Sequence, residues 1–138
     1  MKINRIDHVS IAVRDLDEAT RIYAALGLKV ERVTEVPEQK VRVAFISVGE
    51  STIELVQPTS NNSPVARYLE ARGEGMHHLA LEVDDIEGAL AELSACGVRL
   101  VDKAPRQGAE GRIAFLHPRS TGRVLIELVE PVSGREGV

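Results

Sequence analysis

One short segment of the chain occurs twice. Residues 52–58 are Thr-Ile-Glu-Leu-Val-Gln-Pro, and residues 125–131 are Leu-Ile-Glu-Leu-Val-Glu-Pro. Alternating apolar positions and β-branched residues predict a strand in each copy, and the proline predicts where that strand ends. A glutamate in the middle of such a strand is costly unless something pairs with it. Two glutamates at matching places, Glu54 and Glu127, therefore predict one shared partner.

The repetition extends over most of the chain. An offset of 70 residues pairs residues of the first half with identical residues of the second: His8 with His78, Asp15 with Asp85, Ala19 with Ala89, Gly27 with Gly97 and Phe45 with Phe115. The two glutamates match at an offset of 73, so a few residues are inserted between the last two strands. Internal repetition of this kind predicts one supersecondary unit used twice.

Each half is predicted to contain a strand, a helix and three further strands. The expected strands are 6–13, 28–33, 41–48 and 52–57 in the first half, and 76–83 and one beginning at 98–101 in the second. The expected helices begin at Asp15 and at Asp84 or Asp85 and end at Gly27 and Gly97, with a short third helix at 65–72. The predicted fold class is α+β, with two tandem βαβββ modules that form a curved, partly closed mixed sheet and carry their helices on the outside. The modules cover about 3–58 and 76–131, joined by a linker at 59–75, within a single domain 1–138.

Composition excludes several classes of function. The chain has 138 residues, a formal net charge of -4 and 3% aromatic residues, which argues against nucleic-acid binding. Cys96 is the only cysteine, so no internal disulfide is expected and a reducing compartment fits. We find no apolar run of membrane-spanning length and no signal peptide before the first strand, so we expect a soluble, cytoplasmic protein without a membrane partner.

Strand alternation places four polar side chains on one face. Ile11 and Val13, like Ile53 and Leu55, point to the face that should pack on a helix, and the residues that point the other way are His8, Glu54, His78 and Glu127. Small neighbours (Ser10, Ala12 and Ala80) leave space on that second face. Each of these polar residues alone is most simply a solvated group, but four that match by repeat and by alternation predict a divalent-metal site, around which the sheet would close.

Imidazole and carboxylate ligands suit Zn, Fe, Co, Ni or Mn better than Ca or Mg. We expect one such ion per site, with cobalt as the first choice. Four protein ligands leave one or two positions of an octahedral ion for water or substrate.

Longer stretches resemble a known superfamily. They are Asp7–Val9, Ile53–Leu55 and Ile126–Leu128 in the repeated strands, and the segments Asn61–Ala66, Gly73–His78, Gly108–Arg112 and Phe115–Arg119. The chain resembles the vicinal oxygen chelate (glyoxalase/bleomycin resistance/dioxygenase) superfamily from Ile6 to Glu130, and within it the methylmalonyl-CoA epimerases. That resemblance also puts metal ligands at His8, Glu54, His78 and Glu127. Some epimerases are proposed to use a further carboxylate on the third strand as a base, but residues 41–48 contain none.

The resemblance implies metal-assisted interconversion of (2R)- and (2S)-methylmalonyl-CoA, a step of propionate metabolism, through an enolate. We expect Glu127 to be one acid/base group and Glu54 the other, one for each face of the planar enolate. CoA phosphates need cationic partners, and the expected substrate-binding residues are Arg112, His117, Arg119 and Arg123, with Lys103 and Arg106 nearby in the sequence. A homodimer is usual for the superfamily.

Three alternatives stay open. A lactoylglutathione lyase of the glyoxalase I type would use the same four ligands on a glutathione hemithioacetal. An extradiol dioxygenase needs two histidines and one carboxylate around Fe(II), so the fourth ligand argues against it. A non-enzymatic small-molecule-binding protein of the same superfamily would commonly lack the four ligands.

Overall fold

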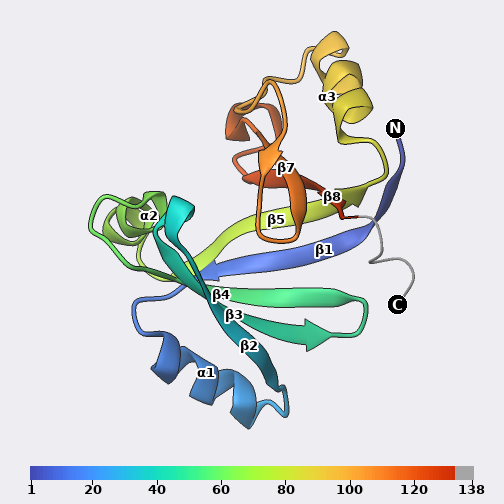
Figure 1. Cartoon of the computed structure of the whole chain (residues 1–138). Coiled ribbons are helices and arrows are strands. Elements are labelled where there is room, and N and C mark those ends of the chain that lie inside the picture. Colours follow the sequence, from blue (N-terminus) through green and yellow to red (C-terminus); the bar gives the residue numbers. More distant parts are fainter. Residues whose placement is uncertain (133–138) are drawn as a thin grey trace. The chain divides into compact units, whose positions relative to one another are not determined.

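The computed structural model describes residues 1–132. The helices are α1 (Leu16–Ala25), α2 (Pro64–Arg72) and α3 (Ile86–Ala95), and short 3₁₀ turns occupy Pro37–Gln39 and Pro118–Ser120. The strands are β1 (Ile3–Ala12), β2 (Val30–Val36), β3 (Val41–Val48), β4 (Ser51–Pro58), β5 (Gly75–Val83), β6 (Arg106–Gln107), β7 (Gly111–Leu116) and β8 (Ile126–Pro131). Helices and a mixed sheet confirm the predicted α+β class (Figure 1). None of the helices described is long and apolar enough to span a membrane.

The chain folds as two compact units. One unit is His8–His77, and the other combines Met1–Asp7 with the residues from His78 onward. β1 and β5 each supply residues to both units, so the start of β1 belongs with the second half of the sequence rather than the first.

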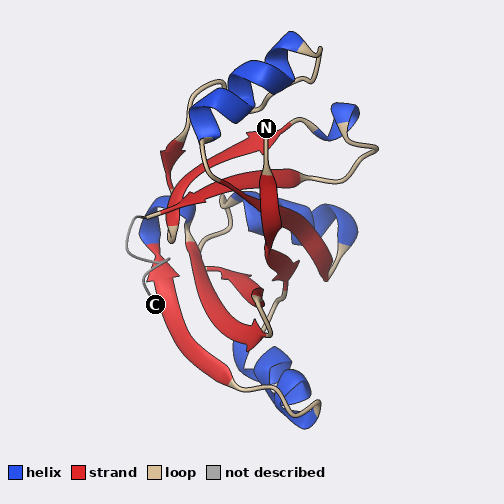
Figure 2. Ribbon diagram, turned by 90° about the vertical axis from the view of Figure 1, so that its right-hand side faces the viewer, coloured by secondary structure: helices blue, strands red, loops and turns tan. Residues whose placement is uncertain are grey.

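In the unit of residues 8–77, the strand order is β2-β3-β4-β1. β1 runs parallel to β4, while β2, β3 and β4 are antiparallel neighbours. α1 covers one face through a core cluster that includes Leu16, Ile46 and Leu55. α2 packs on the other face, where Val65 and Leu69 meet the residues Ala12, Val41, Val43, Phe45 and Val56. The strands are strongly twisted, as Figure 2 shows.

The second unit repeats this plan. β5 runs parallel to β8, and β7 is antiparallel to both β8 and the two-residue β6. α3 packs against one face, where Ile86, Leu90 and Leu128 are buried together. The predicted alternation is visible here, because Leu128 and Ile126 lie with the helix while Glu127 points the other way.

The strand expected to begin at 98–101 is not formed as a strand. Only an isolated bridge joins Leu100 to Leu116, and the ladder resumes at β6. The physical reason lies at Asp102, whose Oδ2 accepts the backbone N–H of Phe115 at 2.8 Å and so replaces a ladder hydrogen bond. Pro105, which has no N–H to donate, follows shortly afterwards.

The repeat extends to the way each helix begins. Asp15 accepts the N–H of Glu18 and Asp85 accepts the N–H of Gly88, as N-cap residues do. A second acceptor comes from the end of the last strand of each half. Gln57 Oε1 accepts the N–H of Leu16 at 2.7 Å, and Glu130 Oε1 accepts the N–H of Ile86 at 3.1 Å. The last polar residue of each repeated segment therefore ties a strand end to a helix start.

We expect Gln57→Ala and Glu130→Ala each to lower the free energy of unfolding by about 0.5–2 kcal/mol, the usual cost of losing a helix cap. Chemical denaturation monitored by circular dichroism measures this. Glu50→Ala, at an exposed turn, is the matched control and should change little. A Gln57→Ala protein as stable as wild type would show that this acceptor is replaceable by water.

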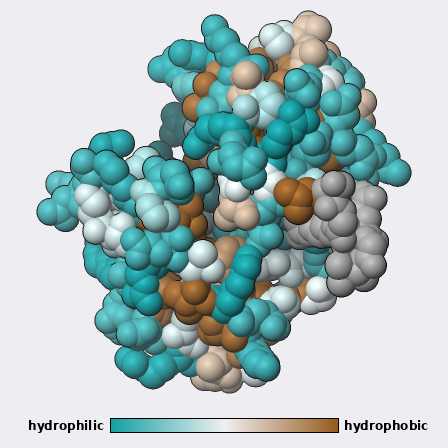
Figure 3. Space-filling view, viewed as in Figure 1, coloured by the Kyte–Doolittle hydropathy of each residue, from teal (hydrophilic) through white to brown (hydrophobic). Residues whose placement is uncertain are grey.

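The core of the first unit should be sensitive to truncation. Leu55 is 0% exposed and packs with Leu16 and Ile46, so Leu55→Ala should cost about 2–5 kcal/mol of unfolding free energy. Figure 3 shows that apolar side chains also reach the surface, and Ile22, 61% exposed, supplies the control. Ile22→Ala should stay within about 0.5 kcal/mol of wild type when both are measured by chemical denaturation. Equal effects of the two substitutions would contradict the assigned core.

Candidate metal centre

The first histidine–glutamate pair lies in the unit of residues 8–77. His8 projects from β1 and Glu54 from β4, the parallel neighbour of β1. His8 Nδ1 lies 3.2 Å from Glu54 Oε2, and both side chains are largely buried. One nitrogen donor and one carboxylate donor thus meet on the face that α1 does not cover.

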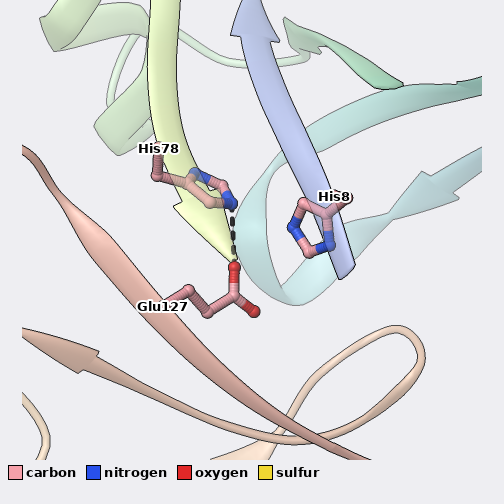
Figure 4. Close-up of side chains that lie close together, drawn as sticks. All are labelled: His8, His78 and Glu127. Atoms are coloured by element: carbon pink, nitrogen blue, oxygen red, sulfur yellow. Dashed lines mark ion pairs between the residues drawn. The ribbon is translucent and has the colours of Figure 1, made fainter. Parts of the chain in front are cut away.

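The second pair repeats this arrangement in the other unit. His78 projects from β5 and Glu127 from its parallel neighbour β8, and His78 Nε2 lies 2.8 Å from Glu127 Oε1 (Figure 4). Glu127 is 5% exposed, so its carboxylate is removed from bulk water. A buried carboxylate of this kind requires a compensating charge or hydrogen bonds.

Each glutamate has a phenylalanine beside it on the next strand. Phe45 pairs with Glu54 and Phe115 with Glu127, so each ring shares a face with its carboxylate. The His78 ring meets the Phe115 ring edge-on, with centroids 5.3 Å apart. The rings therefore wall each pair with apolar surface, which strengthens electrostatic interactions beside it.

An arginine lies over each of these rings. Arg32 Cζ is 4.0 Å from the centroid of Phe45, and Arg106 Cζ is 5.6 Å from that of Phe115. Arg106 is held there by Asp102, whose Oδ1 accepts from Nε at 3.2 Å. Sequence reasoning missed Arg32 and noted Arg106 only as one of several nearby cations. The matched residues Phe45 and Phe115 are the sequence signal that could have predicted both arginines, because the face of an aromatic ring attracts a cation.

The donor atoms of both pairs fit a divalent cation. Each pair offers one imidazole nitrogen and one carboxylate oxygen about as far apart as neighbouring ligands of one ion, which suits a borderline transition metal. The His8, Ser10 and Ala12 side of β1 and the Glu54 and Val56 side of β4 are the same face, as alternation predicted.

Arg112, expected to contact substrate, lies on the other face of β7 from Phe115. Its guanidinium donates to Glu130 at 2.9 and 3.1 Å and to Glu87 of α3 at 3.1 Å. These hydrogen bonds, first to Glu130 and then to Glu87, raise the pKa of Arg112 above its ordinary value. The contacts tie α3 to β7 and β8.

The other three expected substrate contacts lie around the turn after β7. His117 caps the 3₁₀ turn, since its Nδ1 accepts the N–H of Arg119 at 3.1 Å. Arg119 and Arg123 are exposed, and Arg123 has a positive φ of 71°. His117 therefore has at least a local structural role, while the two arginines present their charge to solvent.

Comparison with known proteins identifies the family. The model of the Glyoxalase/Bleomycin resistance protein/Dioxygenase superfamily matches residues 7–116. The chain belongs to this superfamily, as its sequence motifs predicted.

Within the superfamily, the similarity to methylmalonyl-CoA epimerases covers nearly the whole chain. The ethylmalonyl-CoA/methylmalonyl-CoA epimerase of Cereibacter sphaeroides is 38% identical over 91% of this chain and 97% of its own length. A solved methylmalonyl-CoA epimerase in complex with methylmalonyl-CoA and NH4+ aligns with a TM-score of 0.89 at 37% identity, covering 96% of this chain and 97% of that one. The lactoylglutathione lyase of Salmonella typhimurium is less similar, at 31% identity over 97% of this chain and 98% of its own.

Proposed function

We propose that the chain is an isomerase that interconverts the (2R) and (2S) forms of methylmalonyl-CoA. The observation that carries this proposal is similarity to epimerases over nearly the full length, together with two histidine–glutamate pairs. The reaction removes the proton from C2, between a thioester and a carboxylate, and returns one to the opposite face. The chemical difficulty is the negative charge that develops on the enolate oxygen between these two steps.

We propose that His8, Glu54, His78 and Glu127 together hold one divalent cation. The matched halves support a shared ion, since each contributes the same two donors. When bound, such a cation supplies a Lewis acid that stabilises negative charge on the thioester oxygen. The histidines must be neutral and the glutamates ionised for the ion to bind.

Glu127 and Glu54 are the proposed acid/base groups. In one direction, ionised Glu127 takes the C2 proton from one face, and Glu54, which has taken up a proton from water once substrate is bound, gives that proton to the other face. Glu127 then returns its proton to water, and the roles reverse in the opposite direction. Residues 41–48 contain no acidic side chain, so β3 offers no competing carboxylate. Phe45 and Phe115 place apolar surface beside each glutamate, which strengthens the electrostatic stabilisation of charge that develops there.

The cationic residues proposed for CoA are Arg112, His117, Arg119 and Arg123. CoA carries several phosphates, and guanidinium groups bind phosphate oxygens through two N–H donors at once. Arg119 and Arg123 are exposed and suited to this contact, whereas Arg112 is already engaged by Glu87 and Glu130. Arg119 and Arg123 are therefore the first two to substitute in a CoA-binding measurement.

Exchange of hydrogen for deuterium at C2 of methylmalonyl-CoA tests the proposed reaction. Protein loaded with a divalent ion should catalyse exchange in D₂O and racemise the single (2S) isomer, as followed by NMR and by a stereospecific coupled assay. The glutathione–methylglyoxal hemithioacetal serves as the competing substrate. Turnover of the hemithioacetal without C2 exchange would refute the epimerase proposal and favour the lyase.

The narrower expectations from the sequence are proposals as well. Cobalt is the proposed ion, because its flexible coordination suits two imidazoles, two carboxylates and an incoming substrate oxygen. A cytoplasmic homodimer acting in propionate metabolism is proposed from the family resemblance. Metal analysis of protein purified without added metal tests the identity of the ion, and light scattering tests the oligomeric state.

A further inference from the structure

Ser10 carries a buried hydroxyl that the described protein does not satisfy. Its side chain is 0% exposed, and among residues 1–132 its Oγ is the buried side-chain polar atom for which no hydrogen-bond partner is found. Burying a hydroxyl without a partner is costly, and native proteins rarely do so. An unsatisfied hydroxyl in a native fold therefore points to a partner that binds from outside the chain.

The position of Ser10 places that hydroxyl beside the first histidine–glutamate pair. Ser10 lies two residues from His8 on β1, so both point to the same face. Across the sheet it stands next to Glu54 on β4, and Glu54 in turn stands next to Phe45 on β3. Ser10, Glu54 and Phe45 thus form one row, with the hydroxyl on the strand that also carries His8.

The repeat shows that folding does not require this hydroxyl. Ala80 occupies the matching position in the second half, 70 residues on, and stands next to Glu127 on β8 as Ser10 stands next to Glu54. Ala80 is also 0% exposed, so an alanine packs at the equivalent place in a sheet of the same plan. Ser10 therefore differs from its counterpart by one oxygen atom that packing alone does not explain.

We propose that Ser10 is a substrate-binding residue whose hydroxyl donates a hydrogen bond to an oxygen of the acyl group, either of the thioester or of the free carboxylate. This assignment rests on the proposed function. A serine hydroxyl donates one hydrogen bond, whereas ionised Glu54 can only accept. Ser10 can therefore donate a hydrogen bond to a bound anion, and Glu54 cannot. Where the acceptor is the thioester oxygen, the bond gains strength as negative charge grows on that oxygen during removal of the C2 proton.

The proposal also makes the two halves of the site unequal. Glu54 has a hydroxyl donor beside it, whereas Glu127 has only the methyl group of Ala80 at that strand position. A substrate oxygen bound by Ser10 therefore lies on the Glu54 side, and this contact fixes the orientation of the bound acyl group. Ser10 would act as a specificity determinant for acyl thioesters that carry an oxygen acceptor at this place.

Ser10→Ala, Ser10→Thr and the control Ser94→Ala, on the exposed surface of α3, test this. Calorimetry with metal-loaded protein measures the affinity for malonyl-CoA and for propionyl-CoA, which lacks the free carboxylate, and the C2-exchange rate is measured separately. We expect Ser10→Ala to lower the exchange rate by about 10²-fold, as loss of one donor to a developing oxyanion does. Ser10→Thr, which keeps the hydroxyl, should recover most of that rate, and Ser94→Ala should match wild type.

The two acyl-CoA compounds identify the oxygen. Weaker binding of both by Ser10→Ala assigns the hydrogen bond to the thioester oxygen, and weaker binding of malonyl-CoA alone assigns it to the carboxylate. Affinities and exchange rate all within about twofold of wild type would overturn the proposal and leave water as the partner of Ser10. Loss of bound metal from Ser10→Ala would overturn it as well, because the hydroxyl would then support the ion.

Thermal unfolding separates these outcomes from simple misfolding. The metal-free Ser10→Ala protein should unfold at the same temperature as wild type or higher, because the substitution removes an unsatisfied buried group. If wild type shows no C2 exchange at all, the proposed reaction fails, yet the difference in acyl-CoA affinity between wild type and the Ser10→Ala variant still decides the role of the hydroxyl.

Discussion

Glu127→Gln is expected to reduce C2 exchange in methylmalonyl-CoA by about 10²- to 10⁴-fold, the usual contribution of one general acid/base group. The side chain is 5% exposed, lies 2.8 Å from His78 and is walled by Phe115, so bulk water has little access to act as a substitute base. Glutamine keeps the size of the side chain and one oxygen, which preserves packing while removing the proton acceptor. Exchange is followed by the loss of the C2 proton signal in D₂O under metal-saturating conditions.

The matched control is Glu130→Gln, the same chemical change three residues further along β8. Glu130 accepts hydrogen bonds from Arg112 and from the backbone N–H at the start of α3. Its substitution should therefore lower stability slightly and leave the exchange rate near that of wild type. Circular dichroism and metal content confirm that both variants are folded and loaded. A Glu127→Gln protein with near-normal exchange would remove this residue from the acid/base role.

His8→Ala and His78→Ala are each expected to abolish stoichiometric binding of the divalent ion. Removing a group that merely supports a metal ligand costs about 10- to 100-fold in affinity, so losing a ligand itself should cost at least as much. Metal content after gel filtration, and titration calorimetry with Co²⁺ or Zn²⁺, measure the effect. Catalysed C2 exchange should fall in parallel and should not return at saturating substrate.

The same pair of variants tests whether the two histidine–glutamate pairs share one ion. With a shared ion, either single substitution removes all bound metal, whereas two separate ions would leave half of it in each variant. His77→Ala is the control, because this ring packs edge-on against Tyr68 at 4.9 Å and points to the other side of β5 from His78. Unchanged metal content in both His8→Ala and His78→Ala would exclude the proposed centre.

Sequence reasoning succeeded where the signal was periodic. Alternation along β1, β4, β5 and β8 separated the residues that face α1 and α3 from the ligand residues, and Leu55 and Leu128 are indeed buried with these two helices while Glu54 and Glu127 point away from them. It failed at 98–101, where a side-chain acceptor, Asp102, replaces the ladder hydrogen bond of Phe115. No local sequence pattern predicts such a replacement, because it depends on which distant strand lies next to Asp102 in the folded protein.

The cationic residues show the same dependence on tertiary structure. Arg112 stays a proposed CoA contact, and its partners Glu87 and Glu130 come from a helix and a strand on either side of it in the sequence. The guanidinium of Arg32 lies 4.0 Å over Phe45, although no local pattern around Arg32 marks this contact. An arginine looks alike in the sequence whether it binds substrate, closes an ion pair or covers a ring, so only its neighbours in space distinguish these roles.

By itself, the sequence determined the repeated βαβββ plan, the helix caps and the four side chains that share one kind of face. These follow from local geometry, because a period of two and a turn residue act over a few positions. The tertiary structure decided that His8 meets Glu54 and His78 meets Glu127, and that the hydroxyl of Ser10 is buried beside Glu54 without a partner among the described residues. Such facts arise from strands that are distant in sequence and adjacent in the sheet, where hydrogen-bond register sets which side chains touch.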